Sequence, residues 1–391
     1  MSSHCFIHPW LRPDESWGGF RVHGRNSAPP AAATIATLFG NPALALIDAH
    51  LPWFIPVATL DDAEQTLSLG NDRSIILLPA AGPDAEAAAL EHALRQAGRR
   101  LGLLLAPGDP LPPTGVWPFV VLPIGVARTL PPYGLIGLGS RSQLVITGVR
   151  NRADQAWASA NQCTLHSSEY LLARATPSDK PDLTRVKLLE LLALVATDAD
   201  TGQIEQIIRQ ETKLAYGLLR LVNSAAIAPR SPITSFSQAI TLLGRRQLQR
   251  WFQLLVYAGQ NNGPHTNPLL LVAATRGRLM ELLAARLPQC AAIENLGDLS
   301  FMSGTFSLLD ILLHLSMHDV LAQLPLPAVV DQALDCHQGP LGPLLLALSA
   351  IDSGDHDLAG EILDQLGIDG PTFGEAQVDA LVWASGIRVA P

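Results

Sequence analysis

The sequence predicts an α/β half followed by an all-α half. Five short apolar runs bounded by proline or glycine recur between residues 53 and 146, with a helical pattern among them. After residue 182 these runs stop, and apolar residues recur at helical spacing instead. The chain has 391 residues, of which 48% are hydrophobic. This is a longer chain than a single hydrophobic core of usual size can accommodate. We therefore expect two domains.

The five apolar runs are predicted to be buried strands. Between the second and third run lies Asp84–Gly98, with Leu90 and Leu94 on one helical face. Uninterrupted apolar strands that alternate with helices are typical of a parallel sheet covered on both faces. Residues 1–176 are therefore predicted to form an α/β domain. The predicted strands are Trp53–Val57, Ser74–Leu78, Leu101–Leu105, Pro118–Leu122 and Gln143–Ile146.

The polar, proline-bearing segment Ala175–Asp182 is predicted to be a linker. Residues 177–350 are predicted to form an all-α domain, and residues 351–391 a helical extension of it. That extension is expected to hold one helix near Leu358–Leu366 and an irregular tail. The first predicted helices of the all-α domain are Leu183–Ala196, Thr201–Gln210 and Leu214–Asn223.

Start and stop signals define the next helices. Ser235–Gln238 has the pattern of a capping box, and Gly244 suits the left-handed position at a helix end. Asn267 and Pro268 predict the start of a helix that continues to Leu287. A buried stripe at helical spacing is formed by Leu248, Trp251, Phe252 and Leu255.

The composition argues against several classes of protein. A formal net charge of −9 disfavours broad attraction to nucleic acid or to an anionic membrane. The four cysteines form no Cys-x-x-Cys pair, so buried free thiols are expected rather than a zinc site or disulfides. The N-terminus lacks the pattern of a secretory signal, and no apolar run reaches about 18 residues. We expect a soluble, cytoplasmic protein.

Several ordered motifs between residues 180 and 350 carry a family resemblance. The main ones are Leu218–Ala225 and Ile233–Gly244, together with Leu188–Leu192, Ile204–Ile208 and the helix around Trp251. In this order they resemble the HDOD family, a helical output module related to HD-type phosphohydrolases but lacking their metal-binding residues. The resemblance implies a protein that relays a signal through contacts with other signalling proteins.

The metal-binding residues of HD-type enzymes are missing here. Such enzymes need a His-Asp pair because a metal must activate water or bridge a phosphate. The run that matches the one before this pair is Phe301–Phe306, and Ser307 and Leu308 follow it. The preceding helix, Leu270–Leu283, contains no histidine. No metal and no cofactor is therefore expected in this half.

The first half resembles a shortened, degenerate EAL domain, the (β/α) barrel that hydrolyses cyclic di-GMP. The best match is Leu144–Ala160 with Cys163 and Tyr170–Arg174; Ile7–Arg12 and Gly19–Arg25 match the opening strands. The resemblance implies a barrel whose activity would lie at the carboxyl ends of its strands. The two resemblances together predict the fold class: a shortened, degenerate EAL-like (β/α) barrel followed by an HDOD helical bundle.

The catalytic positions of that family are occupied by other residue types. The signature glutamate falls at Arg21 and the metal-binding asparagine at Pro56. Two-metal hydrolysis needs several acidic ligands, and Asp109 is the only acid close to a matching strand end. We therefore expect that the protein is not an enzyme. The remaining positions are Leu104 and Leu105 for an Asp pair, Val121 for a lysine, and Thr147 and Arg150 for late glutamates.

Two sets of residues are candidate contacts. Arg21, Arg25 and Arg150 could converge near the barrel mouth and hold a phosphate of a nucleotide such as cyclic di-GMP. Solvent-exposed or ion-paired arginines are the alternative. In the helical half, the interaction surface is predicted to include Asn223, Ser224, Arg245 and Arg246. Here the alternatives are backbone capping by Asn223 and Ser224 and a solvated face for the arginines, including Arg250, Arg276 and Arg278.

Two further groups of residues resemble catalytic sites. His314, His318 and Asp319 have the spacing of metal ligands on one helix, and Cys336 with His337 and Asp335 resembles a nucleophile site. We expect exposed or structural residues in both. Three functions stay open: a non-catalytic signalling protein, a cyclic-dinucleotide sensor without hydrolysis, and a residual phosphohydrolase that uses the histidine group. The first is preferred, without DNA or membrane as partner.

Overall fold

The computed structural model describes residues 4–25, 28–69, 72–80, 85–174, 189–194, 202, 205, 217–219, 221–224, 227, 233, 236–258 and 267–387. Contacts divide the chain into two compact units. The barrel unit comprises residues 1–173, 351–360 and 369–378, and the helical unit comprises 174–350, 361–368 and 379–391. The predicted domain boundaries, 1–176, 177–350 and 351–391, stay a prediction.

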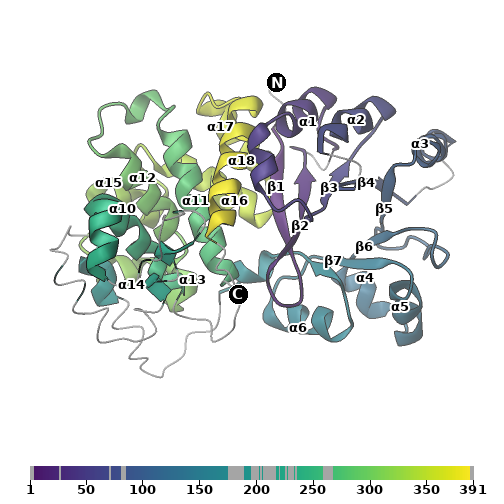
Figure 1. Cartoon of the computed structure of the whole chain (residues 1–391), viewed down its shortest axis with the longest axis horizontal. Coiled ribbons are helices and arrows are strands. Elements are labelled where there is room, and N and C mark those ends of the chain that lie inside the picture. Colours follow the sequence, from purple (N-terminus) through teal and green to yellow (C-terminus); the bar gives the residue numbers. More distant parts are fainter. Residues whose placement is uncertain are drawn as a thin grey trace. The chain divides into compact units, whose positions relative to one another are not determined.

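Eight strands close into a barrel in sequence order (Figure 1). β1 pairs with β2 and with β8 in antiparallel fashion, and every pairing from β2 to β8 is parallel. The predicted fold class of a (β/α) barrel followed by helices is confirmed. The strands are β1 (Phe6–Leu11), β2 (Trp17–His23), β3 (Trp53–Pro56), β4 (Ser74–Pro79), β5 (Arg100–Leu104), β6 (Phe119–Pro123), β7 (Gln143–Thr147) and β8 (Leu165–His166).

All five strands predicted from the apolar runs form, each within about two residues of its predicted ends. Their inward side chains fill the barrel, so the interior is a packed core rather than a channel. Burial of this surface at about 25 cal/mol per Å² is the main stabilising term. The interior cluster is Trp10, Phe54, Ile75, Leu77, Phe119, Val121, Val145 and Leu165.

Short helices connect the strands of the barrel, and side chains cap the starts of some of them. Thr59 and Asp62 form a reciprocal capping box at α2, and Asn151 accepts from the Asp154 amide at α6. The connecting elements are α1 (Ala32–Phe39), η2 (Pro42–Leu46), α2 (Leu60–Glu64), η3 (Gln65–Leu69), α3 (Ala85–Gln96), α4 (Ile124–Thr129), α5 (Pro132–Gly139), α6 (Arg152–Ala160) and η4 (Glu169–Leu172).

Helices make up most of the described part of the C-terminal region. The predicted helix near Leu358–Leu366 is α17 (His356–Gln365), but the expected irregular tail is wrong, because α18 (Gly370–Gly386) is a regular helix. Asp369 accepts a hydrogen bond from the Thr372 amide at its start. Buried Phe373 and Val378 anchor it. Parts of both helices belong to the barrel unit.

The first segments of the helical unit lie largely outside the described residues. They include most of the three predicted helices before Asn223 and Ser235 of the predicted capping box. Residues 189–194 and 217–219 are helical. The other elements are α10 (Phe236–Ala258), α11 (Pro268–Ala284), η5 (Pro288–Cys290), α12 (Leu296–Phe306), α13 (Leu309–Leu313), α14 (Met317–Leu321), α15 (Ala328–Cys336) and α16 (Gly342–Ser353), whose last residues belong to the barrel unit.

Two predicted boundaries are confirmed in this unit. Gly244 has φ 72° and ψ 163°, a conformation that glycine adopts readily, and it interrupts the helical backbone of α10. Asn267 caps α11 by accepting from the Leu269 amide. The helices α11 and α12 approach closely where Gly277 faces Gly304: a Cβ at Gly304 would lie 2.7 Å from the Gly277 Cα.

None of the described helices is long and apolar enough to span a bilayer.

Candidate functional site

The substituted strand positions lie near the carboxyl ends of the barrel strands. Pro56, Leu104 and Thr147 are the last residues of β3, β5 and β7, while Arg21 lies two residues before the end of β2. In a barrel of parallel strands these ends form one mouth, where side chains from several strands meet. The structure therefore has, at these positions, a cation and uncharged side chains rather than carboxylates.

Arg21 points into the barrel. Residues paired across two strands share a face, and β1 pairs with β2 so that His8 faces Arg21 and Trp10 faces Gly19. Trp10 belongs to the interior cluster, and the Arg21 guanidinium carbon lies 5.8 Å from the centre of its ring. Arg21 is 8% exposed, and its Nε and Nη1 atoms have no hydrogen-bond partner among the described residues. Burial lowers the pKa of Arg21 to about 10.

Three histidines lie beside this arginine at the same mouth. His8 and His23 come from β1 and β2, and His356 comes from the start of α17. Their ring centres are 4.7–5.1 Å apart in all three pairs. The Nε2 atoms of His8 and His356 are 2.9 Å apart, so one ring donates to the other. This cluster was not predicted from the sequence.

Burial is the largest cause that keeps these imidazoles uncharged. It lowers the pKa of His8 to about 3, with help from the charges of His356 and Arg21. The pKa of His23 lies well below its usual value for the same reasons. Burial also lowers the pKa of His356, against the opposing effect of Asp357 and Asp355. The mouth therefore holds one buried cation and three neutral donor–acceptor groups.

Aromatic contacts fix the C-terminal residues of the barrel unit on β1. The ring of Phe6 stacks on His356 at 5.0 Å and meets the edge of Phe373 at 5.5 Å. The Ile7 amide donates to Gln377 Oε1 at 3.1 Å. β8 pairs with β1 only at Leu11, so Gln377 takes an amide of β1 that no strand pairing uses.

The other two arginines of the predicted phosphate site lie in different surroundings. Arg25 follows β2 and lies so close to Gly360 that a Cβ at that glycine would be 2.6 Å from its Nε. Arg150 is exposed on the loop after β7, and its charge lowers the pKa of Glu169, which burial raises more strongly. Convergence of all three on one phosphate stays a prediction.

Asp109, the acid nearest to a strand end, has a structural contact. Its Oδ2 accepts from the Ala106 amide at 2.7 Å and its own amide donates to the Ala106 carbonyl. It thus closes the turn after β5.

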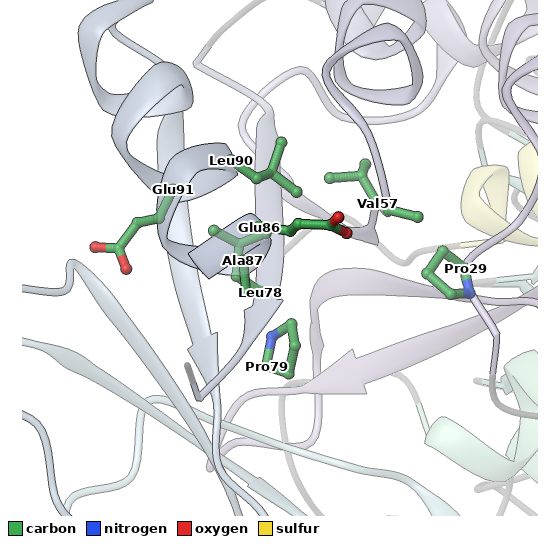
Figure 2. A pocket seen from close by; sticks show the side chains of 9 residues that line it. Pro29, Val57, Leu78, Pro79, Glu86, Ala87, Leu90 and Glu91 are labelled. Carbon is green, nitrogen blue, oxygen red and sulfur yellow. The ribbon is translucent and has the colours of Figure 1, made fainter. Parts of the chain in front are cut away.

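A hollow of about 310 Å³ lies beside α3 and the ends of β3 and β4 (Figure 2). Its walls are mostly apolar, and the Glu86 carboxylate points toward Val57, while Glu91 points away. The remaining lining residues are Pro29, Ala58, Leu78, Pro79, Ala87 and Leu90. Among the described residues, no basic side chain lines it, so it does not match a phosphate.

In the helical unit, an arginine contact occupies the position that follows the Phe301–Phe306 run. Ser307 lies between α12 and α13, and Arg276 of α11 donates to its hydroxyl at 2.7 Å. Arg276 is 7% exposed, and Leu308 is 1% exposed. A buried guanidinium and a hydroxyl do not bind a cation.

The two groups that resemble catalytic sites do not assemble one. α13 ends before His314, which has φ 53°, and α14 begins at Met317, so His314 and His318 do not share a helix. His314, His318 and Asp319 are exposed, and Asp319 caps α14 with Ser316. Cys336 is exposed, and Asp335 raises the pKa of its thiol. Among the described residues, no group of three His, Cys, Asp or Glu side chains is arranged to hold a metal ion.

The predicted interaction surface is only partly described. Asn223 is exposed, yet its amide accepts from the Ile233 amide at 2.7 Å and donates to the Ile233 carbonyl at 2.8 Å. Ser224 is 4% exposed. The side chains of Arg245 and Arg246 lie outside the described part. These contacts fit the capping interpretation of Asn223, and the surface stays a prediction.

The other basic residues do not form a free patch. Arg250 is paired with Asp298 at 2.7 Å and with Glu281 at 2.8 Å, and Arg278 with Glu281 at 2.6 Å. Arg250 joins α10 to α11 and α12, and Arg276 is buried, so the expectation of a solvated face fails for these two arginines. Arg278 pairs with Glu281 within α11.

The HDOD domain family model matches residues 152–290. The chain carries an HDOD domain. The match begins in α6 and ends at Cys290, and thus overlaps the predicted range 177–350 over residues 177–290. With the closed barrel before it, the match supports the predicted tandem of an EAL-like barrel and an HDOD domain.

Two curated proteins are similar to this HDOD-containing chain. YuxH of Bacillus subtilis (strain 168) is 30% identical over 192 residues, which are 48% of this chain and 45% of that protein. A Vibrio cholerae protein named cyclic di-GMP phosphodiesterase CdgJ is 30% identical over 191 residues, 49% of this chain and 43% of that protein. The chain thus spans less than half the length of each relative.

Similar solved structures include the EAL-like domain protein YdiV, at 13% identity and a TM-score of 0.32, covering 43% of this chain and 90% of that one. An HDOD domain protein from Geobacter sulfurreducens has 15% identity and a TM-score of 0.24, and the match covers 53% of this chain and 60% of that one.

Proposed function

We propose that this HDOD-containing protein is a non-catalytic regulator of signal transduction that acts through protein contacts of its HDOD half. Its barrel is proposed to have lost the residues of a cyclic di-GMP phosphodiesterase. The relative named for that activity gives the link to cyclic di-GMP signalling.

The proposal rests on the buried side chain of Arg21 at the barrel mouth. A divalent cation at the barrel mouth would lie close to a buried guanidinium for which no carboxylate partner is found among the described residues. Like charges at a separation of a few ångströms repel strongly in a poorly solvated interior. Hydrolysis of a phosphodiester requires the opposite arrangement, in which several acidic ligands surround the metal ions.

Affinity capture with the full chain tests the contact half of the proposal. The matched baits are the wild-type chain and the double variant Arg245→Glu and Arg246→Glu, which reverses two charges of the predicted surface. A partner retained in stoichiometric amount by wild type and lost with the variant supports the proposal. Equal retention by both baits, or none by either, contradicts this choice of surface and partner mode.

A second function is a sensor that binds a cyclic dinucleotide without cleaving it. Two nitrogen atoms of Arg21 have no hydrogen-bond partner among the described residues, and a phosphate oxygen would satisfy them, which favours this function. Titration of the full chain with cyclic di-GMP, repeated with Arg21→Met and with Arg286→Met as a surface control, tests this function. Saturable binding that only Arg21→Met weakens by at least tenfold favours the sensor; no binding at high micromolar concentration excludes it.

A further inference from the structure

The C-terminal residues that belong to the barrel unit contact the mouth directly. We call residues 351–360 and 369–378 the C-terminal plug. Phe6, His8, Arg21 and His23 share the inward face at the carboxyl end of β2, as the strand register requires. His356 of the plug contacts three of these four side chains. The plug therefore covers the part of the mouth that holds Arg21.

The hydrogen bond between His8 and His356 forms only while at least one of the two rings is uncharged. The Nε2 atoms of the two rings are 2.9 Å apart, so one must carry a hydrogen and the other must offer a lone pair. Two imidazolium rings would direct two N–H groups at each other. Protonation of the second ring therefore turns an attractive contact into a repulsive one.

The charges around the cluster strengthen this dependence. Arg21 lies opposite His8 on the neighbouring strand and acts on all three histidines as a cation. Asp355 and Asp357, on the plug itself, favour protonation of His356, but burial outweighs them. Arg25 packs against Gly360 and adds a further positive charge at the plug.

Two contacts of the plug that involve no titratable side chain complete the interface. Phe373 packs on Phe6 with ring centres 5.5 Å apart. The titratable ring of His4 lies next to both rings at 6.1–6.3 Å. Gln377 holds the Ile7 amide.

We propose that the C-terminal plug closes the barrel mouth through the uncharged histidine cluster and opens it when these imidazoles take up protons. Acidification then exposes Arg21 to solvent and to any anionic ligand. This inference goes beyond the proposed function and holds whether or not the barrel binds a nucleotide.

The expected size of the effect follows from linkage. A group whose pKa is lowered in the closed state stabilises that state above its free pKa and opposes it as pH falls below that value. With a free imidazole pKa of about 6.5 and a closed-state value of about 3 for His8, closing weakens about tenfold by pH 5.5. His23 and His356 act in the same direction.

Hydrogen exchange of the full chain measures the opening. Amide protection is followed by mass spectrometry at pH 7.5 and 5.5, with a chelator present, and corrected for the intrinsic pH dependence of exchange. Peptides that contain Ile7 and residues 369–378 are expected to lose at least tenfold in protection at pH 5.5. Peptides of β4 and β7 serve as internal controls. Unchanged protection of the plug, or an equal loss in β4 and β7, overturns the proposal.

Three variants separate the mechanism from general acid sensitivity. His356→Phe keeps a ring on Phe6 but removes one titrating group, so the pH-dependent loss is expected to shrink. Arg21→Met removes the neighbouring cation and is expected to reduce the loss as well, which keeps the test decisive if His356→Phe fails to fold. The control His92→Phe changes an exposed histidine on α3. A full wild-type response in both Arg21→Met and a folded His356→Phe overturns the proposal.

Discussion

Asn223 and Ile233 are joined by a reciprocal pair of hydrogen bonds. The side-chain amide accepts from the Ile233 N–H at 2.7 Å and donates to the Ile233 carbonyl at 2.8 Å, while Ile233 itself is buried. This pair links the end of the helical segment before Asn223 to the chain ten residues later. The asparagine of the HDOD-like motif thus has a structural role, whatever partner the domain binds.

Removal of that amide is expected to destabilise the helical unit. Asn223→Ala leaves the backbone groups of Ile233 without their partner, which costs about 1–3 kcal/mol. Asn223→Asp keeps the acceptor and should cost less. Urea unfolding measures both variants. Gln323→Ala, whose lost hydrogen bond is exposed, is the control and should change stability by less than about 0.5 kcal/mol. Equal losses of stability in Asn223→Ala and in this control would show that Asn223 has no structural role.

The crossing of α11 and α12 permits no side chain at Gly304. A Cβ there would lie 2.6 Å from the Arg276 carbonyl oxygen, a backbone atom that cannot move away alone. We expect Gly304→Ala to destabilise the protein by about 2–3 kcal/mol, since overpacking forces the helices apart. Gly137→Ala is the matched control, because nothing lies within 4 Å of its Cβ position in α5. It should be neutral or stabilise by up to about 1 kcal/mol. Thermal unfolding of both variants decides the point.

Arg250 joins three helices and is expected to matter more than a surface arginine. Its side chain is 18% exposed and bonds Asp298 and Glu281, which come from α12 and α11. Arg250→Met leaves two carboxylates beside each other and should cost about 2 kcal/mol at pH 7. Arg286→Met, at an exposed position, should have no measurable effect. Denaturant unfolding of both variants at pH 7 measures this, and equal stabilities of the two variants would contradict it.

Thiol reactivity should differ among the cysteines. Cys5, Cys163 and Cys290 are buried, and burial raises the pKa of Cys5 to about 12 and of Cys163 to about 11. Only a thiolate attacks a disulfide reagent, so Cys336 should react first in the native protein, and all four after unfolding. Asp335→Asn should accelerate the reaction of Cys336 with the reagent, because Asp335 raises the pKa of the Cys336 thiol. Fast native labelling of Cys5 would contradict the packing of β1.

The sequence predicted the central strands well because each is a continuous apolar run between breakers, and β3 to β7 form at those runs. It missed α18, where Gly370, Gly374 and Gly386 weaken the helical pattern and tertiary packing of Phe373 overrides it. The histidine cluster was also missed, because His8 and His356 are 348 residues apart. Histidines at inward positions of apolar strands were the available signal, but only the fold brings them together.

An assay of cyclic di-GMP hydrolysis by the full chain asks whether the barrel mouth still holds catalytic metal ions. The protein is incubated at micromolar concentration with cyclic di-GMP and either Mg²⁺ or Mn²⁺, and the linear dinucleotide product is quantified against a no-protein blank. We predict product at the level of the blank with both metals. Turnover above the blank that is abolished by a chelator would show a working metal site and would rule out a non-catalytic barrel.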